Sequence, residues 1–512
     1  MPDTSLLKPY NATCGGGLVL NKDVYDMAPG EALQLVNFEP STEGGYRRLN
    51  GTTKYNSTIV PQVSSSTERV QMSAIFNDNI IAARGGTVVY GGTSGSWTSL
   101  ATSQGTTNTY DFDKFNFNGT SKIIIATGEA AAFTVDSSFN VDVINATGGG
   151  TAPTNPKFVK TFANHVFYGG MSNSTHSILF SVPFSEDNFT SASGAGEIKV
   201  GDIVTGLKVF RDELFIFCQR KIYKLTGTTS SNFALAEVAK NVGTIAHHSI
   251  QELGGDLIFL AADGLRTVAG TAKIGDVELG TISKNVQSLF DKNLKDSSLF
   301  ESVIIPDKTQ YRIFFVKDTV AGSLTRGVIC VMKGDRFEFS EMLGIRPSST
   351  DTFVDAGDVL VLHGSFEGYI LRQEKGNTFD GTSILGRYRS PDLNFGDSGL
   401  RKHMQRVIVN FKPESSIDAD LKLRYDNESV ESARPDPYPL DSSTVAAQYG
   451  TAVYSTTSSA TQFVYGGSTQ PLVRQSVEGS GFTVALRVDD GGETAPYSLK
   501  GFQLEYQVGA RR

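Results

Sequence analysis

The side chains best suited to nucleophilic or metal chemistry are few and scattered. Cys14, Cys218 and Cys330 are widely spaced, without a CxxC pair or a His-Cys cluster at metal-ligand spacing. Among the 6 histidines, His247 and His248 are the only adjacent pair. Because neighbours on a β-strand point to opposite faces, we expect that these two rings cannot chelate one ion. The sequence predicts reduced, structural cysteines and no metal site.

Carboxylates are the other groups that could carry a reaction. A glycoside hydrolase needs two of them converging across one bond, and convergence is not visible in a sequence. Sialidase-like propellers repeat a motif with an Asp and a Gly a few residues before a Trp. The single tryptophan, Trp97, follows residues 92–96, which contain no aspartate. Phosphate loops, dinucleotide fingerprints and nucleophile elbows are also missing from the sequence. We therefore expect a non-enzymatic protein with no catalytic residue and no cofactor.

The charge balance limits the possible partners. With 46 basic and 54 acidic side chains, the chain of 512 residues has a net charge of -8. It lacks the basic surplus that neutralises phosphates in tight complexes with nucleic acid. A mildly acidic surface is compatible with a channel through which DNA slides, because like charges prevent adhesion. No apolar run reaches about 18 residues and no leader pattern opens the chain, so we expect cytoplasmic synthesis and no membrane span.

Short apolar runs, rich in β-branched and aromatic residues, fill residues 66–375 and alternate with Gly, Asn, Asp and Ser clusters. A tight polar turn before a strand recurs at residues 77–79, 163–164, 211–213 and 254–256. The intervals between these turns are irregular, as in degenerate blades with insertions. A β-propeller would close such units without long exposed edges, and a stacked sandwich would satisfy the same strand count. We predict a β-propeller over residues 66–375.

Two short helices are expected. One opens at residues 28–31, with Pro29 in the first turn and Leu33 and Val36 at helical spacing. The other follows Ser283 as N-cap and carries its apolar residues at i, i+3, i+4 and i+8. Both are predicted to pack against a sheet.

The pattern changes near residue 375. Beyond it, alternating strands predict an antiparallel sandwich over residues 376–512. A stretch at residues 426–471, rich in Ser, Thr, Ala and Gly in its later part, predicts a variable, exposed excursion. Residues 1–65 are predicted to form an arm and hairpin that pack with this domain. The predicted fold class is all-β, a β-propeller with a C-terminal antiparallel β-sandwich platform domain and few short helices.

An ordered series of segments resembles the tail nozzle proteins of short-tailed bacteriophages, also called tail tubular or stabilisation proteins. The series begins with residues 16–18, 28–38 and 44–51, continues through 178–181, 186–189, 201–207, 213–217, 221–227 and 262–266, and ends with 386–391, 402–407 and 501–506. The resemblance spans nearly the whole chain, although no single motif is diagnostic. Candidate intersubunit or structural residues within these segments are Gly45, Tyr46, Arg47, Arg48, Arg406 and Tyr506. For Arg47 and Arg48, a solvated strand end is the alternative to an intersubunit contact.

The resemblance implies a structural virion protein located in the phage tail. Its subunits would form a homo-oligomeric ring of six below the portal and the head-tail adaptor. The ring would contact tail fibres and a terminal plug or needle, retain the packaged genome, and let genomic DNA pass during ejection. Ring formation requires two different patches on each subunit. The alternatives are a tail protein whose propeller loops bind a host glycan, and a propeller-fold glycan hydrolase.

Overall fold

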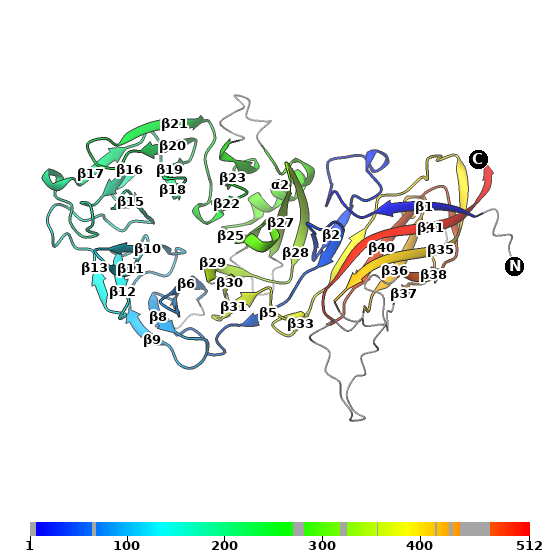
Figure 1. Cartoon of the computed structure of the whole chain (residues 1–512), viewed down its shortest axis with the longest axis horizontal. Coiled ribbons are helices and arrows are strands. Elements are labelled where there is room, and N and C mark those ends of the chain that lie inside the picture. Colours follow the sequence, from blue (N-terminus) through cyan, green and yellow to red (C-terminus); the bar gives the residue numbers. More distant parts are fainter. Residues whose placement is uncertain are drawn as a thin grey trace.

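The computed structural model describes residues 7–63, 68–269, 281–317, 325–355, 357–414, 417–429, 434–440 and 472–511. Two bodies lie side by side, a β-propeller and a β-sandwich (Figure 1). The predicted all-β fold with few short helices is confirmed. None of the helices in the described ranges has the length and apolar character needed to cross a membrane.

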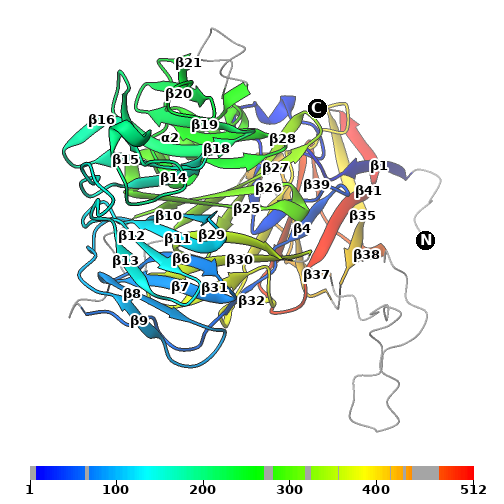
Figure 2. The same cartoon turned by 60° about the vertical axis from the view of Figure 1, so that its left-hand side comes forward.

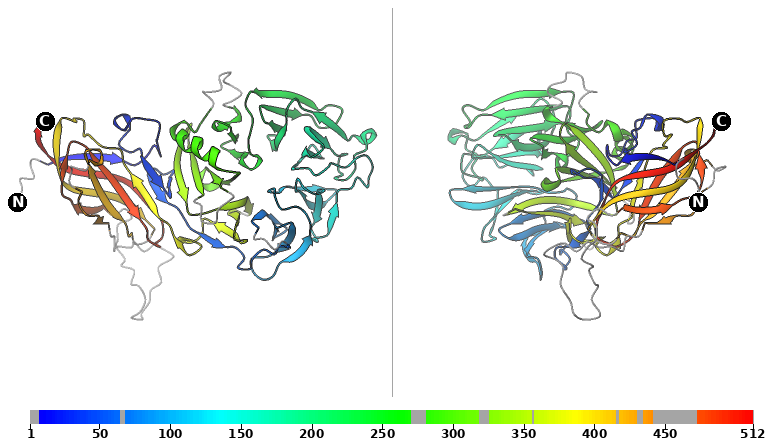
Figure 3. Two further views of the ribbon diagram at one scale, coloured as in Figure 1. Left: turned by 180° about the vertical axis from the view of Figure 1, so that it is seen from behind. Right: turned by 45° about the vertical axis from the view of Figure 1, so that its right-hand side comes forward.

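The propeller consists of small antiparallel sheets, here called blades, that follow one another around a central axis (Figure 3). Figure 2 shows the first four blades one above another. The first contains β6 (Val70–Phe76), β7 (Asn79–Arg84), β8 (Thr87–Gly91) and β9 (Thr98–Ala101), and the second contains β10 (Asp111–Phe117), β11 (Thr120–Ala126), β12 (Phe133–Asp136) and β13 (Val141–Val143). The third contains β14 (Phe158–Phe162), β15 (His165–Met171), β16 (Ser174–Phe180) and β17 (Gly196–Lys199), and the fourth contains β18 (Val204–Phe210), β19 (Glu213–Cys218), β20 (Lys221–Thr226) and β21 (Ala234–Lys240). The later blades are β22 (Gln251–Leu253), β23 (Asp256–Ala261) and β24 (Gly264–Thr267); β25 (Leu299–Ile305), β26 (Gln310–Val316), β27 (Arg326–Lys333) and β28 (Arg336–Leu343); and β29 (Pro347–Asp355), β30 (Asp358–Ser365) and β31 (Ile370–Gln373) with β5 (Thr52–Lys54), β32 (Thr378–Phe379) and β33 (Thr382–Ser383).

Several strands are buried along their whole length because each blade is covered on both faces by its neighbours. Every residue of β6, β15 and β26 is buried. Separate apolar clusters lie between consecutive blades; one joins β6–β8 to β10–β12, and another joins β14–β16 to β18–β20. The blades therefore stack through dry interfaces around the axis.

The recurring polar turns occupy one equivalent position in several blades. Each is a two-residue loop joining the first strand of a blade to the second, with both residues at positive φ: Asn77-Asp78, Ala163-Asn164, Arg211-Asp212 and Gly254-Gly255. Positive φ at both positions is the type I′ geometry that matches the twist of a hairpin. The predicted turns are confirmed, and they mark the same corner of successive blades.

The ring is closed by a strand from the beginning of the chain. β5 pairs with β31, the third strand of the last blade. Next to it, Leu362 and Ile370 of the last blade pack against Val70 and Ile80 of the first. Because one blade combines strands from both ends of the propeller, the ring cannot open without breaking this sheet.

The sandwich places two sheets face to face. One contains the long strands β35 (Leu400–Pro413) and β41 (Tyr497–Arg511) with β1 (Lys8–Thr13), β3 (Phe38–Pro40), β4 (Tyr46–Arg48), β38 (Leu472–Ser476) and β39 (Ser480–Gly481). The other contains β2 (Gln34–Val36), β34 (Gly386–Arg389), β36 (Asp420–Tyr425), β37 (Tyr438–Pro439) and β40 (Val484–Asp490). Inward residues such as Val409 and Leu504 from one sheet and Leu423 and Leu486 from the other form the core.

The second sandwich sheet continues into the propeller. β2 pairs with β28 on one side and with β34 on the other, which produces one nine-stranded sheet in the order β25-β26-β27-β28-β2-β34-β40-β36-β37. Figure 1 shows β2 between the β27–β28 hairpin and the sandwich. The described part of residues 1–65 therefore contributes to both bodies, with β1, β3 and β4 in the sandwich and β5 in the propeller.

Only the second predicted helix forms. The short 3-10 turn η6 (Lys284–Val286) leads into α2 (Gln287–Asp296), whose Phe290 is fully buried. The hydroxyl of Ser283 does not cap this helix but accepts a hydrogen bond from the Leu265 amide at 3.2 Å. The other short 3-10 turns in the described ranges are η2 (Val24–Asp26), η3 (Ser191–Ser193), η4 (His247–Ser249), η7 (Pro306–Lys308) and η8 (Asp426–Glu428).

The prediction of a helix from residue 28 is wrong. Residues 34–36 form β2, and the Leu33 amide donates to the Arg389 carbonyl at 2.9 Å instead of to a helical partner. Gly30 lies so close to β1 that a Cβ atom there would be 1.9 Å from the Thr13 oxygen. Long-range strand pairing overrides the local helical spacing. Of the predicted excursion at residues 426–471, residues 430–433 and 441–471 lie outside the described ranges.

Candidate functional site

Two polar regions are candidates for function: the junction between the two bodies and a cavity on the propeller axis. Four of the residues singled out in the sequence, Gly45 to Arg48, lie at the junction. Gly45 has φ +79, and a Cβ atom there would lie 2.4 Å from the Leu499 oxygen. The Tyr46 hydroxyl donates to the Gly30 carbonyl at 2.7 Å and accepts from the Gly17 amide at 3.1 Å. Both residues hold β4 against its surroundings within one chain.

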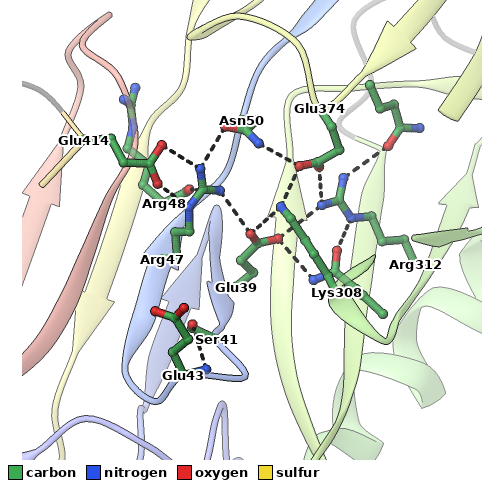
Figure 4. Close-up of polar contacts among 12 residues, drawn as sticks. Glu39, Ser41, Glu43, Arg47, Arg48, Asn50, Lys308, Arg312, Glu374 and Glu414 are labelled. Carbon is green, nitrogen blue, oxygen red and sulfur yellow. Dashed lines mark hydrogen bonds and ion pairs between the residues drawn. The ribbon is translucent and has the colours of Figure 1, made fainter. Parts of the chain in front are cut away.

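A network of charges crosses the junction (Figure 4). Glu39 of β3 receives Lys308 at 2.6 Å and Arg312 at 3.2 Å, both from the propeller. Arg312 and Lys308 each also contact Glu374, just after β31, at 2.5 Å. The side chain of Arg312 is 1 % exposed and that of Glu39 is 3 % exposed. Two carboxylates and two cations therefore neutralise one another where the bodies meet.

The ionised state of this network is fixed by pairing. Burial raises the pKa of Glu374, but the positive charges of Arg312 and Lys308 outweigh it and hold the pKa well below its usual range. Arg47 extends the network, since it contacts Glu39 at 3.3 Å and grips Glu414 with Nε at 2.7 Å and a second nitrogen at 2.9 Å. This forked contact joins β4 to residues just after β35.

Arg48 points to the opposite side of β4 and is entirely buried. It pairs with Asp490 at 3.1 Å and donates to the carbonyls of Thr494 and Gly492 at 2.5 Å. Burial raises the pKa of Asp490, with Arg48 opposing the shift. Arg48 is thus not a solvated strand end, and its side chain does not reach a surface where another subunit could touch it.

The other two predicted residues, Arg406 and Tyr506, lie on the long strands of the sandwich. Arg406 pairs with Glu505 at 3.1 Å and its side chain is 45 % exposed. The ring of Tyr506 packs against Phe395, with centroids 4.7 Å apart. The six predicted residues therefore do not converge on one site.

The second region, which sequence reasoning missed, is a cavity of about 490 Å³ on the propeller axis. It is lined by the first strands of the blades, namely β6, β10, β14, β18, β22, β25 and β29, and by η4. Its charged lining comes from Asp111, Asp113, Lys160, Lys208 and Asp351, together with the two histidines of η4. No local motif unites these residues, because they come from β10, β14, β18, β29 and η4, which are far apart in the sequence.

Many polar side chains of this lining bind the backbone of the neighbouring blade. Asp111 and Asp113 of β10 accept from the amides of Val159 and Thr161 on β14 at 2.9 and 2.7 Å. Further contacts of this kind, here called stitches, are Thr350 to the Ser302 carbonyl at 2.7 Å, Thr352 to the Ile304 carbonyl at 2.8 Å, and the Ile75 amide to Asp351 at 3.3 Å. Beside the cavity, Ser348 donates to the Val70 carbonyl at 2.8 Å. The free backbone groups of inner strands are thereby satisfied, and adjacent blades are tied together.

The two adjacent histidines are not placed as expected. They form the 3-10 turn η4 rather than a strand, so both line the cavity, with ring centroids 5.1 Å apart. Nε2 of His247 lies 3.1 Å from Oδ1 of Asp111. Burial, aided by His247, lowers the pKa of His248 to about 3. Within the described ranges, no group of three or more His, Cys, Asp or Glu could hold a metal ion.

The carboxylates of the region differ in their protonation. Burial raises the pKa of Asp111, but His247 and Lys160 outweigh it and hold the pKa well below its usual range. Burial raises the pKa of Asp351. It also raises the pKa of Glu301 to about 8, but Glu301 is fully enclosed and is not part of the cavity wall. Asp351 and Glu301, the two with raised pKa values, therefore do not face one opening together.

The three cysteines are free and buried. Burial raises the pKa of Cys218 to about 12 and moves those of Cys14 and Cys330 further upward. A thiol in such surroundings is a poor nucleophile, because the thiolate is the reactive form.

No protein-family model and no curated protein matches the sequence. Similar solved structures include the AfRom2 CNH domain, 9% identical over 63% of this chain and 98% of that chain, with a TM-score of 0.38. PorZ, a surface component of the type-IX secretion system of Porphyromonas gingivalis, is 12% identical over 69% of this chain and 44% of that chain, with a TM-score of 0.35. An exo-β-1,3-galactanase from Phanerochaete chrysosporium is 8% identical over 90% and 100%, with a TM-score of 0.27. At these identities and scores, the similarities carry no argument about activity or ligand.

Proposed function

We propose that this chain is a tail nozzle subunit of a short-tailed bacteriophage, a structural protein of the virion. In this role, subunits form a ring of six that extends the tail, retains the packaged genome and conducts DNA during ejection. The ordered sequence segments that resemble the nozzle family support this proposal. The observation that carries it is the mechanical continuity of the two bodies.

A tube that withstands the pressure of packaged DNA needs subunits that do not bend. Here the propeller and the sandwich share the nine-stranded sheet, so the hydrogen-bond ladder runs from one body to the other without a linker. The network of Glu39, Arg312, Lys308 and Glu374 locks the same boundary from the side. Flexibly joined domains meet through smaller, more polar surfaces and move by default. This chain is built as one stiff piece.

The net charge of the chain is compatible with a tube through which DNA passes. The net charge of -8 gives the surface no general attraction for DNA phosphates, which suits rapid passage of the genome. The proposed partners are further copies of this chain, the head-tail adaptor above the ring, and tail fibres with a plug or needle below it. The protein is not proposed to be an enzyme, since Asp111, Asp113 and Asp351 already serve as blade-to-blade stitches.

Imaging of the assembled protein tests the proposal. The purified full chain, alone and mixed with the adaptor protein of the same phage, would be examined by native mass spectrometry and electron cryo-microscopy. We expect closed rings of six copies that bind the adaptor coaxially. A chain that stays monomeric at high concentration and binds neither adaptor nor fibre would overturn the proposal.

A further inference from the structure

One cation in the axial cavity has no partner. Lys208 of β18 lines the cavity and, among the described residues, makes no hydrogen bond or ion pair. The neighbouring Lys160 differs, because it donates to Asp111 and to the Phe112 carbonyl, both at 2.8 Å. Burial lowers the pKa of Lys208, and the charge of Lys160 adds to this effect. Lys208 is half-buried, and its ammonium group, which carries three donors, is left available to water or to a ligand in the cavity.

Carboxylates face Lys208 across a gap. Asp111 and, more weakly, Asp113 act electrostatically on Lys208, and Lys208 acts on Asp351 more weakly than Lys114 does. None of these three carboxylates comes within ion-pair distance of the Lys208 ammonium. Asp113 uses one oxygen for both bonds to Thr161, at 2.7 and 2.5 Å, and its other oxygen makes no bond within the described chain. A donor and two acceptors thus surround a space that protein atoms do not fill.

A hydroxyl group fits this arrangement better than an ion. It accepts a hydrogen bond from an ammonium group and at the same time donates one to a carboxylate. The other strong charges of the cavity already compensate one another, since Asp111 is paired with both Lys160 and His247. An added cation or anion would upset this balance, whereas a neutral ligand with several hydroxyl groups would not.

We propose that the axial cavity binds one neutral sugar unit, whose hydroxyl groups accept from Lys208 and donate to Asp113 and Asp351. The cavity of about 490 Å³ lies within the size range of small-molecule sites. The stitches between blades hold Asp113 and Asp351 in place before the ligand arrives, which reduces the entropy cost of binding. The site is independent of ring assembly, so it can exist whether or not the proposed function is correct.

The binding test uses the full chain with glucose, galactose and mannose, followed by saturation-transfer NMR and calorimetry. We expect at least one of these sugars to bind, and Lys208→Met to weaken its binding at least tenfold. The matched control is Lys199→Met, which removes an exposed lysine of β17 and should leave binding unchanged. Asp351→Asn should also weaken binding, because the amide cannot accept as strongly.

Glucuronate and inorganic phosphate form the second arm. Binding of either anion in preference to the neutral sugars would overturn the proposal in favour of an anion site. Absence of binding by every sugar would also overturn it and leave a water-filled cavity. Sugar binding that survives Lys208→Met would place the ligand elsewhere and equally refute the site.

Thermal unfolding of the same variants separates loss of binding from loss of fold. Methionine is close to lysine in length and removes a half-buried charge that has no partner in the described chain, so Lys208→Met should unfold at the same temperature as the wild type or higher. A variant that gains stability while losing the sugar is the expected signature of a ligand residue. A large drop in unfolding temperature would show that Lys208 is a structural residue and would overturn its assignment.

Discussion

The junction and the axial cavity use charged side chains in opposite ways. At the junction, Arg312 and Lys308 each touch both Glu39 and Glu374, so that every charge meets its opposite. In the cavity, carboxylates such as Asp113 bind backbone amides of the next blade, and Lys208 is left without a partner among the described residues. The first arrangement leaves nothing for a ligand to satisfy. The second keeps one donor and its acceptors apart.

The difference follows from how the two places are built. At the junction, side chains from two bodies close directly on one another, and the pairing offsets the cost of desolvation. On the propeller axis, inner strands diverge from a common centre, and side chains of ordinary length do not fill the middle. Ion pairs therefore hold the two bodies together at the junction, whereas the unfilled polar space on the propeller axis leaves room for a ligand.

Loss of Arg312 should have the largest effect on stability. Arg312→Met leaves Glu39 and Glu374 facing each other with Lys308 as their shared cation, and should lower the free energy of unfolding by about 3–5 kcal/mol. Urea denaturation measures this change. The control, Arg406→Met, removes an exposed pair with Glu505 and should cost less than about 1 kcal/mol. Equal losses in the two variants would contradict a special role for the junction.

The second prediction concerns Glu301, beside the cavity, and its pH dependence. Its folded-state pKa of about 8 lies above the unfolded value of roughly 4.3, so the folded protein holds the extra proton between them. Stability from neutral Glu301 is full at low pH and is lost as the pH rises toward 8. Relative to the wild type, Glu301→Gln should therefore gain on the order of 3 kcal/mol between pH 5 and pH 8.

Denaturation curves at several pH values test this prediction. The control is Glu493→Gln, an exposed carboxylate of the sandwich. Arg69 is the cation that opposes the shift at Glu301, so it must be kept in both variants. A difference between Glu301→Gln and the wild type that stays constant with pH would show that Glu301 is ionised in the fold.

Two adjacent glycines test how closely β4 approaches β41 at the junction. Gly44 and Gly45 have φ +84 and +79, but only at Gly45 does an added Cβ meet backbone, the Leu499 oxygen at 2.4 Å. In both alanine variants, the strain of a positive φ should lower the free energy of unfolding by about 1 kcal/mol. Gly45→Ala should lower the free energy of unfolding by a further amount of about 1–3 kcal/mol, because β4 must move away from β41. Similar unfolding midpoints for the two variants would refute the close approach.

The smallest effect is expected from a single stitch of the propeller. Thr352→Val keeps the shape of the side chain but removes the hydrogen bond to the Ile304 carbonyl, at a cost of about 1 kcal/mol. Hydrogen exchange should become faster in β25 and β29, the strands that the stitch joins. Thr98→Val, on the exposed outer strand β9, serves as the control and should leave exchange in those strands unchanged.

Much of the local structure could be predicted, because local residues determine it. Asn77-Asp78 and Gly254-Gly255 accept positive φ, so the hairpin corners were visible in the sequence. The helix after Ser283 was also visible from its apolar spacing. The helix predicted from residue 28 is wrong because local spacing does not decide this segment. Leu33 and Val36 have helical spacing, but the backbone here pairs with strands hundreds of residues away.

The candidate sites were harder to predict. Arg47 and Arg48 were noticed as neighbours, but alternation on β4 sends one to Glu414 and the other to Asp490, which no local pattern specifies. His247 and His248 were dismissed on the assumption of a strand, and the 3-10 turn brings both into the cavity. The cavity itself joins residues from every blade, so no window of sequence contains it.

By itself, the sequence determined the all-β character, the positions of most strands and the turns that join them, because backbone preferences and apolar periodicity act over a few residues. Only the tertiary structure decided that β2 would fuse the two bodies into one sheet and that β5 would close the ring. It also decided which charges would be paired and that Lys208 would not be. Partners for these groups come from distant parts of the chain, and the cost of burying a charge depends on what the fold places beside it.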